Sequence, residues 1–166
     1  MNNKKIKGDN MNRSILAQNL FKEGYNCSQS VVLAFSDIVN VDKSTLQKIS
    51  LPLGGGLGRL RLTCGAVSGM ALVIGLIFTE EENSNENKKY VYELTREVIK
   101  RFENSYHTIT CKDLLEQANL EVEIKGSPEE RTKEYYQRRP CDIIVRDAAK
   151  ILEDFLIEKG IIIDNK

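Results

Sequence analysis

The sequence predicts an all-α protein, folded as a single-domain bundle of five to seven helices. Three observations lead to this class. Apolar residues recur at helical spacing through much of the chain, and the strict alternation of apolar and polar residues that marks strands is missing. The composition favours helix, with only three prolines, no tryptophan and many leucine, isoleucine, glutamate and lysine residues. A chain of 166 residues is long enough for one domain with a substantial core.

The N-terminal elements follow from capping signals. A first helix is predicted over about 9–23, because its apolar residues share one side and Gly24 ends it in the usual C-terminal manner. Asn26 is a good N-cap for a second helix, which carries apolar residues at helical spacing as far as Val39. We expect residues 1–8, which precede these helices, to form a basic tail.

The middle of the chain predicts the buried centre of the domain. A short helix covers 42–50 and ends before Pro52, and a glycine-rich loop follows at 54–59. Thr63 is the expected N-cap of a helix over 64–78, which is apolar on nearly every side. This helix contains a series of small residues, namely Gly65, Ala66, Ser68, Gly69, Ala71 and Gly75. Because glycine destabilises a helix by up to about 1 kcal/mol relative to alanine, the series indicates close packing against the helix backbone.

The C-terminal half predicts three further helices. An acidic, asparagine-rich linker at 80–87 precedes a long amphipathic helix, whose apolar face contains Val91, Leu94, Val98 and Phe102. Thr110 is the expected cap of a short helix.

A polar segment at 121–137 follows, with one helical turn expected to begin at Ser127 and Pro128. The last helix covers about 140–159 and ends at Gly160, so the helical domain spans 9–160 and residues 161–166 form a C-terminal tail.

Charge and hydropathy exclude several classes of protein. The 24 lysine and arginine residues balance the 24 aspartate and glutamate residues, and the pI is about 6.6. A nucleic-acid-binding protein would show a positive excess, so we expect no nucleic-acid partner. The longest apolar stretch, 70–78, is too short to span a bilayer, which predicts no membrane insertion. The first ten residues are polar and contain no signal-peptide pattern, so we expect a cytoplasmic protein.

The four cysteines lie far apart in the sequence, at positions 27, 64, 111 and 141. No two of them form a CxxC motif, which is the usual mark of zinc ribbons and thioredoxin-like redox sites. A static disulfide framework is not expected in a cytosolic protein. On spacing alone, they can be read as four small buried apolar side chains.

Each cysteine nevertheless lies at the predicted first turn of a helix. Cys27 follows Asn26, Cys64 follows Thr63, Cys111 follows Thr110, and Cys141 follows Pro140. Free N–H groups and the helix dipole at such a position favour the thiolate. If the four helix starts converge, they form a pocket of thiolates suited to an iron–sulfur cluster or another metal. Basic residues near the cysteines would lower the thiol pKa values further; they are Arg59, Arg61, Lys112, Arg138 and Arg139.

The segment Cys64-Gly65-Ala66-Val67-Ser68-Gly69 resembles the CGAxxG signature of the C_GCAxxG_C_C family of redox-active proteins. Members have one cysteine before the signature and two after it, and Cys27, Cys111 and Cys141 match those positions. The glycine-rich segment 54–59 is also similar, and the likeness spans about 12–158. The resemblance implies a bacterial or archaeal, all-helical protein with a cysteine-based redox or cluster-binding role, and it supplies no reaction or substrate. It gives Gly65, Ala66, Gly69 and Arg59 supporting positions at the site.

Three functions remain open at this point. The leading one is a redox protein in which Cys27, Cys64, Cys111 and Cys141 bind an iron–sulfur cluster, most simply [2Fe–2S], or another metal centre for electron transfer. The second is metal-free thiol–disulfide exchange by the same cysteines, with Cys64 the first to titrate. The third is a non-catalytic structural or interaction module with zinc or simply buried thiols. The redox partner is unidentified, and two long amphipathic helices leave a homodimer open.

Other chemistry has weaker support in the sequence. The single histidine, His107, excludes sites that need several histidines, and a dyad with Cys111 conflicts with a helix cap at Thr110. The glycine-rich loop lacks the GxxxxGK[ST] spacing of a phosphate-binding loop, so we expect it to let the backbone pass close to Cys64. No CxxCH motif is present, which excludes a c-type haem.

Overall fold

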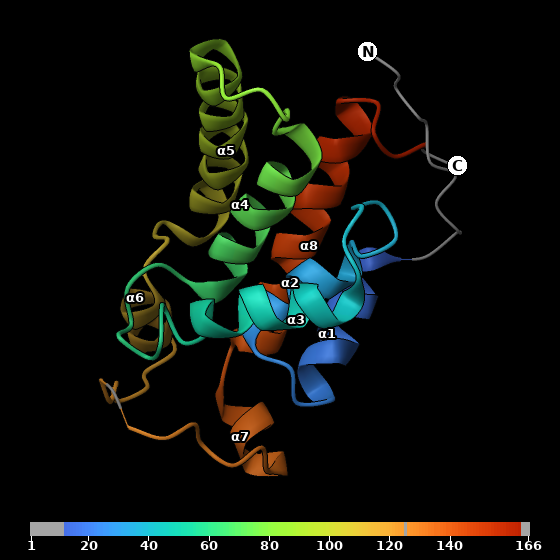
Figure 1. Cartoon of the computed structure of the whole chain (residues 1–166). Helices are drawn as coiled ribbons and strands as arrows, with labels where there is room; N and C mark the ends of the chain where they lie inside the picture. The colour runs from blue at the N-terminus through green and yellow to red at the C-terminus, as the bar shows by residue number, and fades with distance from the viewer. Residues whose placement is uncertain (1–11, 125, 164–166) are drawn as a thin grey trace.

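The computed structural model describes residues 12–124 and 126–163, and this part of the chain forms eight α-helices, one 3-10 turn and no strand (Figure 1). The all-α class is therefore confirmed, with one helix more than the upper end of the expected range. The tail expected at 1–8 lies outside the described residues, as do the first three residues of the helix expected at 9–23 and the last three of the tail expected at 161–166.

The first three helices begin where side chains cap them. Helix α1 spans Arg13–Lys22, α2 spans Cys27–Ala34 and α3 spans Lys43–Ser50, followed by the 3-10 turn η1 at Leu51–Leu53. Asn26 caps α2 through a capping box with Gln29.

Two boundaries in this region differ from the sequence prediction. Helix α1 begins at Arg13, because the side chain of Asn12 accepts a hydrogen bond from the N–H of Ile15. Helix α2 ends at Ala34 rather than near Val39, because the chain changes to tighter turns in which the N–H of Phe35 bonds to the carbonyl of Val32. Val39 is buried all the same.

The remaining helices are α4 at Gly65–Phe78, α5 at Asn85–Tyr106, α6 at Cys111–Gln117, α7 at Lys133–Arg138 and α8 at Cys141–Glu158. The helical turn expected at Ser127 and Pro128 is wrong. The helix in that region, α7, begins later, because the hydroxyl of Thr132 accepts a hydrogen bond from the N–H of Tyr135. The described part of the chain contains no helix that is both long and apolar enough to cross a membrane.

Helices α2 and α4 share the centre of the bundle (Figure 1). Helix α2 contacts α1, α3, α4 and α8, and six of its eight residues are buried. Helix α4 has seven of its fourteen residues buried, as far as Ile74, and the others are half-buried, in agreement with the central position that the sequence predicted. The small residues of α4 allow this packing, since a Cβ atom on Gly69 would lie 3.1 Å from the carbonyl oxygen of Ser28 on α2. Close packing at this helix is therefore confirmed, with α2 as the neighbour.

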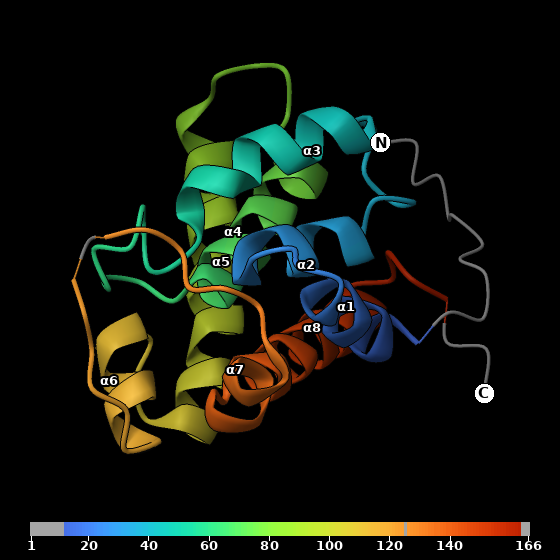
Figure 2. The same ribbon diagram turned by 90° about the horizontal axis from the view of Figure 1, so that it is seen from below.

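Helices α6 and α7 lie at one end of the bundle, where the site is built. The views in Figures 1 and 2 both place the loop at 54–63 beside α6. Helix α7 lies near the ends of α1 and α8, and the ring of Tyr136 packs edge-on against Phe21 of α1 at 6.0 Å between centroids.

Candidate cysteine centre

The four cysteines come from four different helix starts and line one enclosed space. Cys27, Cys111 and Cys141 are the first residues of α2, α6 and α8, and Cys64 is the N-cap of α4. The four helix starts, whose convergence the sequence left open, therefore border one space in the structure. The enclosed space has a volume of about 20 Å³, and its other walls are Gly55, Gly65, Leu114, Leu115 and Ile144.

Backbone pairing brings Cys64 and Cys111 together. The N–H of Cys64 donates to the carbonyl of Ile109 at 2.7 Å, and the N–H of Cys111 donates to the carbonyl of Leu62 at 2.6 Å. These bonds flank an isolated antiparallel bridge between Thr63 and Thr110. The segments before α4 and α6 thus run side by side in opposite directions, and Cys64 and Cys111 follow the bridge at its two ends.

The glycine-rich loop makes room for this pairing. Gly56 has a φ of +70°, and a Cβ atom there would lie 2.7 Å from the Cβ of Cys111. No other residue type fits without displacing the neighbours. The expected close approach is therefore confirmed, but the backbone passes close to Cys111 rather than Cys64.

Cys27 lies against the start of α4. A Cβ atom on Gly65 would be 3.2 Å from the Cβ of Cys27, so the glycine after Cys64 allows the starts of α2 and α4 to meet. Asn26, which caps α2, also donates from its side chain to the carbonyl of Leu51 at 2.9 Å. The same residue thus starts α2 and connects it to the 3-10 turn η1, which precedes the glycine-rich loop.

The thiols differ in pKa although all four lie at helix starts. Burial raises the pKa of Cys64 to about 12, against the opposing effect of the N–H groups of Ala66 and Val67. Burial also raises the pKa of Cys111, although the guanidinium of Arg61, with Nη1 at 3.8 Å from its sulfur, favours the thiolate. The lowered pKa expected from helix position is wrong for both, because desolvation outweighs the helix start.

Cys27 and Cys141 form a coupled pair with opposite shifts. A hydrogen bond between the two thiols, together with burial, raises the pKa of Cys27. The same hydrogen bond lowers the pKa of Cys141, and the charges of Arg139 and Arg131 lower it further against the effect of burial. Cys141 is therefore the thiol with the greatest thiolate character, whereas the sequence put Cys64 forward as the first thiol to examine by titration.

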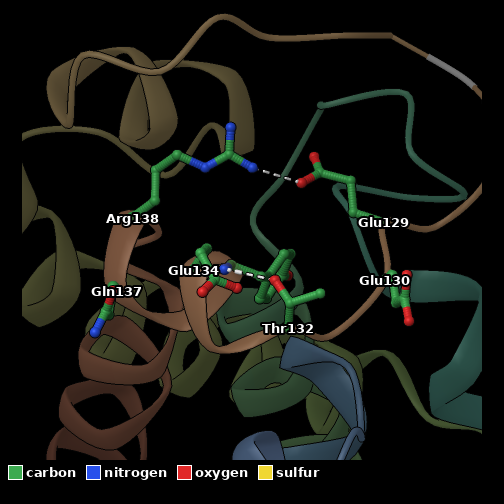
Figure 3. A pocket seen from close by; sticks show the side chains of 7 residues that line it. Glu129, Glu130, Thr132, Glu134, Gln137 and Arg138 are labelled. Carbon is green, nitrogen blue, oxygen red and sulfur yellow. Dashed lines mark hydrogen bonds and ion pairs between the residues drawn. The ribbon is translucent and has the colours of Figure 1, made fainter.

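The basic residues singled out in the sequence fall into two groups. Arg61 is 5% exposed and contacts Cys111, and Arg139 influences Cys141. Lys112 and Arg138 point elsewhere, since Lys112 pairs with Glu116 at 3.6 Å and Arg138 pairs with Glu129 at 2.9 Å (Figure 3).

A larger cavity of about 290 Å³ adjoins the enclosed space and shares Cys27, Cys111 and Cys141 with it. Its walls include residues that sequence reasoning did not select, namely Glu129, Arg131 and Tyr135. They lie in or next to a polar segment without periodicity, so no local signal marks them. Arg59, given a supporting position, lines this cavity and forms an ion pair with Glu123 at 3.8 Å.

Figure 3 shows a second hollow, of about 540 Å³, on the segment that leads into α7. It contains none of the four cysteines. Its lining is mainly acidic and polar, and Glu129 points away from Glu130 and Glu134 toward Arg138. We assign it no chemistry.

The donor set suits a thiolate-ligated metal in kind and number. Four cysteines are the ligand set of structural zinc and of iron–sulfur centres. Within the described part of the chain, however, no three or more histidine, cysteine, aspartate or glutamate side chains are grouped closely enough to ligate one ion as they stand. Binding therefore requires the thiols to close on a common centre. A space of about 20 Å³ accommodates roughly one water-sized sphere.

The other supporting residues differ in their relation to the site. Gly65 borders the enclosed space, and the N–H of Ala66 acts on Cys64. Gly69 faces Ser28 and Val31 of α2, so it packs helices rather than contacting thiols. His107 ends α5 in the left-handed conformation, with a φ of +60°, and is not among the residues that line either space beside the thiols.

Comparison with known families gives one match. Residues 25–155 match the family described as "Putative redox-active protein (C_GCAxxG_C_C)", and the matched segment contains all four cysteines. Neither the curated proteins nor the solved structures contain a match to the chain.

Proposed function

The chain belongs to the C_GCAxxG_C_C family of redox-active proteins, and on that premise we propose that Cys27, Cys64, Cys111 and Cys141 together bind an iron–sulfur cluster or an equivalent iron–thiolate centre for electron transfer. One observation carries the proposal: four cysteines from four helix starts, spread over 115 positions of the chain, line one enclosed space. Buried thiols that served only as apolar side chains would have no reason to gather there.

The surroundings of the thiols support a charged centre. Metal ligation requires thiolates, and the pKa of Cys64 at about 12 means that this side chain stays protonated at neutral pH until a cation displaces the proton. The N–H groups of Ala66 and Val67 then act on the thiolate of Cys64, and the guanidinium of Arg61 acts on that of Cys111. Such donors stabilise negative sulfur and tune the potential of a bound centre.

The redox character of the family favours iron over zinc. Zinc has no redox chemistry of its own, whereas an iron–thiolate centre accepts and returns one electron. The small enclosed space favours a single iron, whereas a [2Fe–2S] cluster would also need the adjoining cavity, which gives the cysteines of α2, α6 and α8 room to adjust. We place this chemistry in the cytoplasm, where thiol ligands stay reduced, with a redox partner still to be identified.

The test is purification without oxygen, followed by a visible spectrum and measurement of iron, zinc and acid-labile sulfide. We expect sulfur-to-iron charge-transfer bands and at least one iron per chain. Cys64→Ser should abolish them, whereas Val73→Ala, a buried residue farther along the same helix that lines neither space beside the thiols, should keep them. A colourless, folded protein without iron or sulfide would overturn the proposal, and zinc at one per chain would identify a structural site instead.

A second function is favoured by the hydrogen-bonded pair of Cys27 and Cys141. In thiol–disulfide exchange, the thiolate of Cys141 attacks a substrate disulfide and releases one substrate thiol, which leaves a mixed disulfide. Cys27 then attacks the sulfur of Cys141, which releases the second substrate thiol and leaves a Cys27–Cys141 disulfide. The substrate gains two electrons and the pair loses two.

This function predicts a different result with the same protein. A metal-free sample should form the Cys27–Cys141 disulfide reversibly, and Cys27→Ser should accumulate the mixed disulfide, both detectable by mass spectrometry. If neither species forms with a small aromatic disulfide as substrate, exchange chemistry is excluded.

A further inference from the structure

The cavity beside the thiols contains a concentration of positive charge. Among its walls are four arginines, Arg59, Arg61, Arg131 and Arg139, and a single carboxylate, Glu129. The same walls include Cys27, Cys111 and Cys141, so any molecule in the cavity lies next to the proposed redox centre.

Two of the arginines, Arg59 and Arg61, already have partners within the protein. Arg61 donates from Nε to the carbonyl of Glu123 at 3.0 Å and from Nη1 to Cys111. Arg59 pairs with the carboxylate of Glu123 at 3.8 Å. Both side chains are therefore engaged with Glu123, and Arg61 also contacts Cys111.

Arg131 is bound differently. Its guanidinium lies over the rings of Phe21 at 4.5 Å and Tyr135 at 4.7 Å, which fixes its position. It forms no ion pair with any described carboxylate, and its buried Nη1 donates to no protein group in that part of the chain. Aromatic stacking satisfies the face of the guanidinium but not its N–H groups.

Arg139 has a similar free donor beside Cys141. Its side chain is 9% exposed, and its guanidinium lies over Tyr135 at 5.0 Å. One end pairs with Glu129, while the buried Nε has no hydrogen-bond partner among the described residues. Arg131 and Arg139 thus pack against the same tyrosine and line the same cavity.

Buried guanidinium donors without acceptors are costly, and an oxygen anion is their natural complement. Here, and resting on the proposed function, we propose that the cavity binds a small molecule with an anionic oxygen group, a carboxylate or a phosphate-like oxyanion, on Arg131 and Arg139 and presents it to the cysteine centre. A volume of about 290 Å³ limits the ligand to a small molecule.

The ion pairs of the walls show which charge an anion would balance. Arg59 pairs with Glu123 and Arg139 pairs with Glu129, whereas Arg61 lies beside the sulfur of Cys111. Arg131 is therefore the wall cation without a described carboxylate partner, and an anionic ligand would neutralise it.

The probe is inorganic phosphate, titrated by calorimetry into the protein as purified without oxygen, at low ionic strength; acetate is the second probe. We expect one site per chain. Arg131→Gln should weaken binding by about tenfold or more, because a charge-assisted hydrogen-bond donor is lost. Glu129→Gln should tighten it, since the substitution frees Arg139. Arg96→Gln, an exposed arginine on α5, is the matched control and should change nothing.

Several outcomes decide the matter. Failure of both phosphate and acetate to bind, or equal weakening in Arg131→Gln and Arg96→Gln, would overturn the inference. If Arg131→Gln loses helical circular dichroism, Arg131→Lys replaces it, because lysine keeps the charge and lacks the fork of donors. Iron and sulfide are measured on the same samples. Iron without anion binding rejects this inference alone, and Arg131-dependent binding without iron supports the anion site while rejecting the iron centre.

Discussion

The two halves of the cysteine centre contrast in how they are built. Cys64 and Cys111 are joined by backbone hydrogen bonds, and burial raises the pKa of both. Cys27 and Cys141 are free thiols linked by a hydrogen bond, and both border the arginine-lined cavity. Cys64 and Cys111 are thus held by backbone hydrogen bonds and favour the protonated thiol, whereas the other pair includes Cys141, whose pKa is lowered. A helix start therefore places a cysteine, but burial and neighbouring cations decide its ionisation.

The largest effect on stability should come from disrupting the backbone pairing that holds Cys64 and Cys111. Gly56→Ala forces a side chain into a left-handed backbone position and against the Cβ of Cys111. We expect a loss of stability of about 1–3 kcal/mol from the backbone alone, with a further loss from the collision. Gly58→Ala is the matched control, because Gly58 has a φ of +54° and open space around it. Urea unfolding of both variants measures the difference, and equal losses would show that the contact with Cys111 is unimportant.

The next largest effect should be a difference in alkylation rate between the two pairs of cysteines. In metal-free protein at pH 7, iodoacetamide should modify Cys141 before Cys64. The thiolate fraction falls tenfold for each pH unit below the pKa, which is about 12 for Cys64 and below the ordinary value for Cys141. Mass spectrometry of peptides at successive times gives the order. Equal rates at the two cysteines would contradict the contrast.

A smaller effect concerns the origin of the shift at Cys141. Arg139→Gln should move the pH midpoint for alkylation of Cys141 upward, because the guanidinium favours the thiolate. The substitution should therefore slow alkylation at pH 7 a fewfold. Lys112→Gln removes a cation next to Cys111 in sequence that pairs with Glu116, so it should leave the midpoint of Cys141 in place. Identical midpoints in wild type and Arg139→Gln would show that Arg139 does not contribute and would leave the shift to Cys27 and Arg131.

Local signals predict much of the fold, because they act within a few residues. Asn26 caps its helix as expected, and Gly24 and Gly160 both follow helix ends with positive φ. Thr132 was missed as a cap because the neighbouring Ser127 and Pro128 are a stronger local signal. The structure assigns those two residues no helix.

The site could be predicted only in part. The position of each cysteine at a helix start is a local property, so all four were identified. The pKa values depend on burial, which arises from contacts between distant segments, and three of the four shifts run against the local expectation. Arg131 lies just before α7, and it belongs to the site because this part of the chain packs near α1, where the guanidinium of Arg131 lies over Phe21. No feature of the segment around Arg131 encodes that contact.

The central claim is that the four cysteines act as one centre, and X-ray absorption at the iron edge tests it most directly. Protein purified without oxygen should give an iron coordination shell made only of sulfur, with four sulfur atoms per iron. Nitrogen or oxygen in the shell, or protein without iron, would contradict the account.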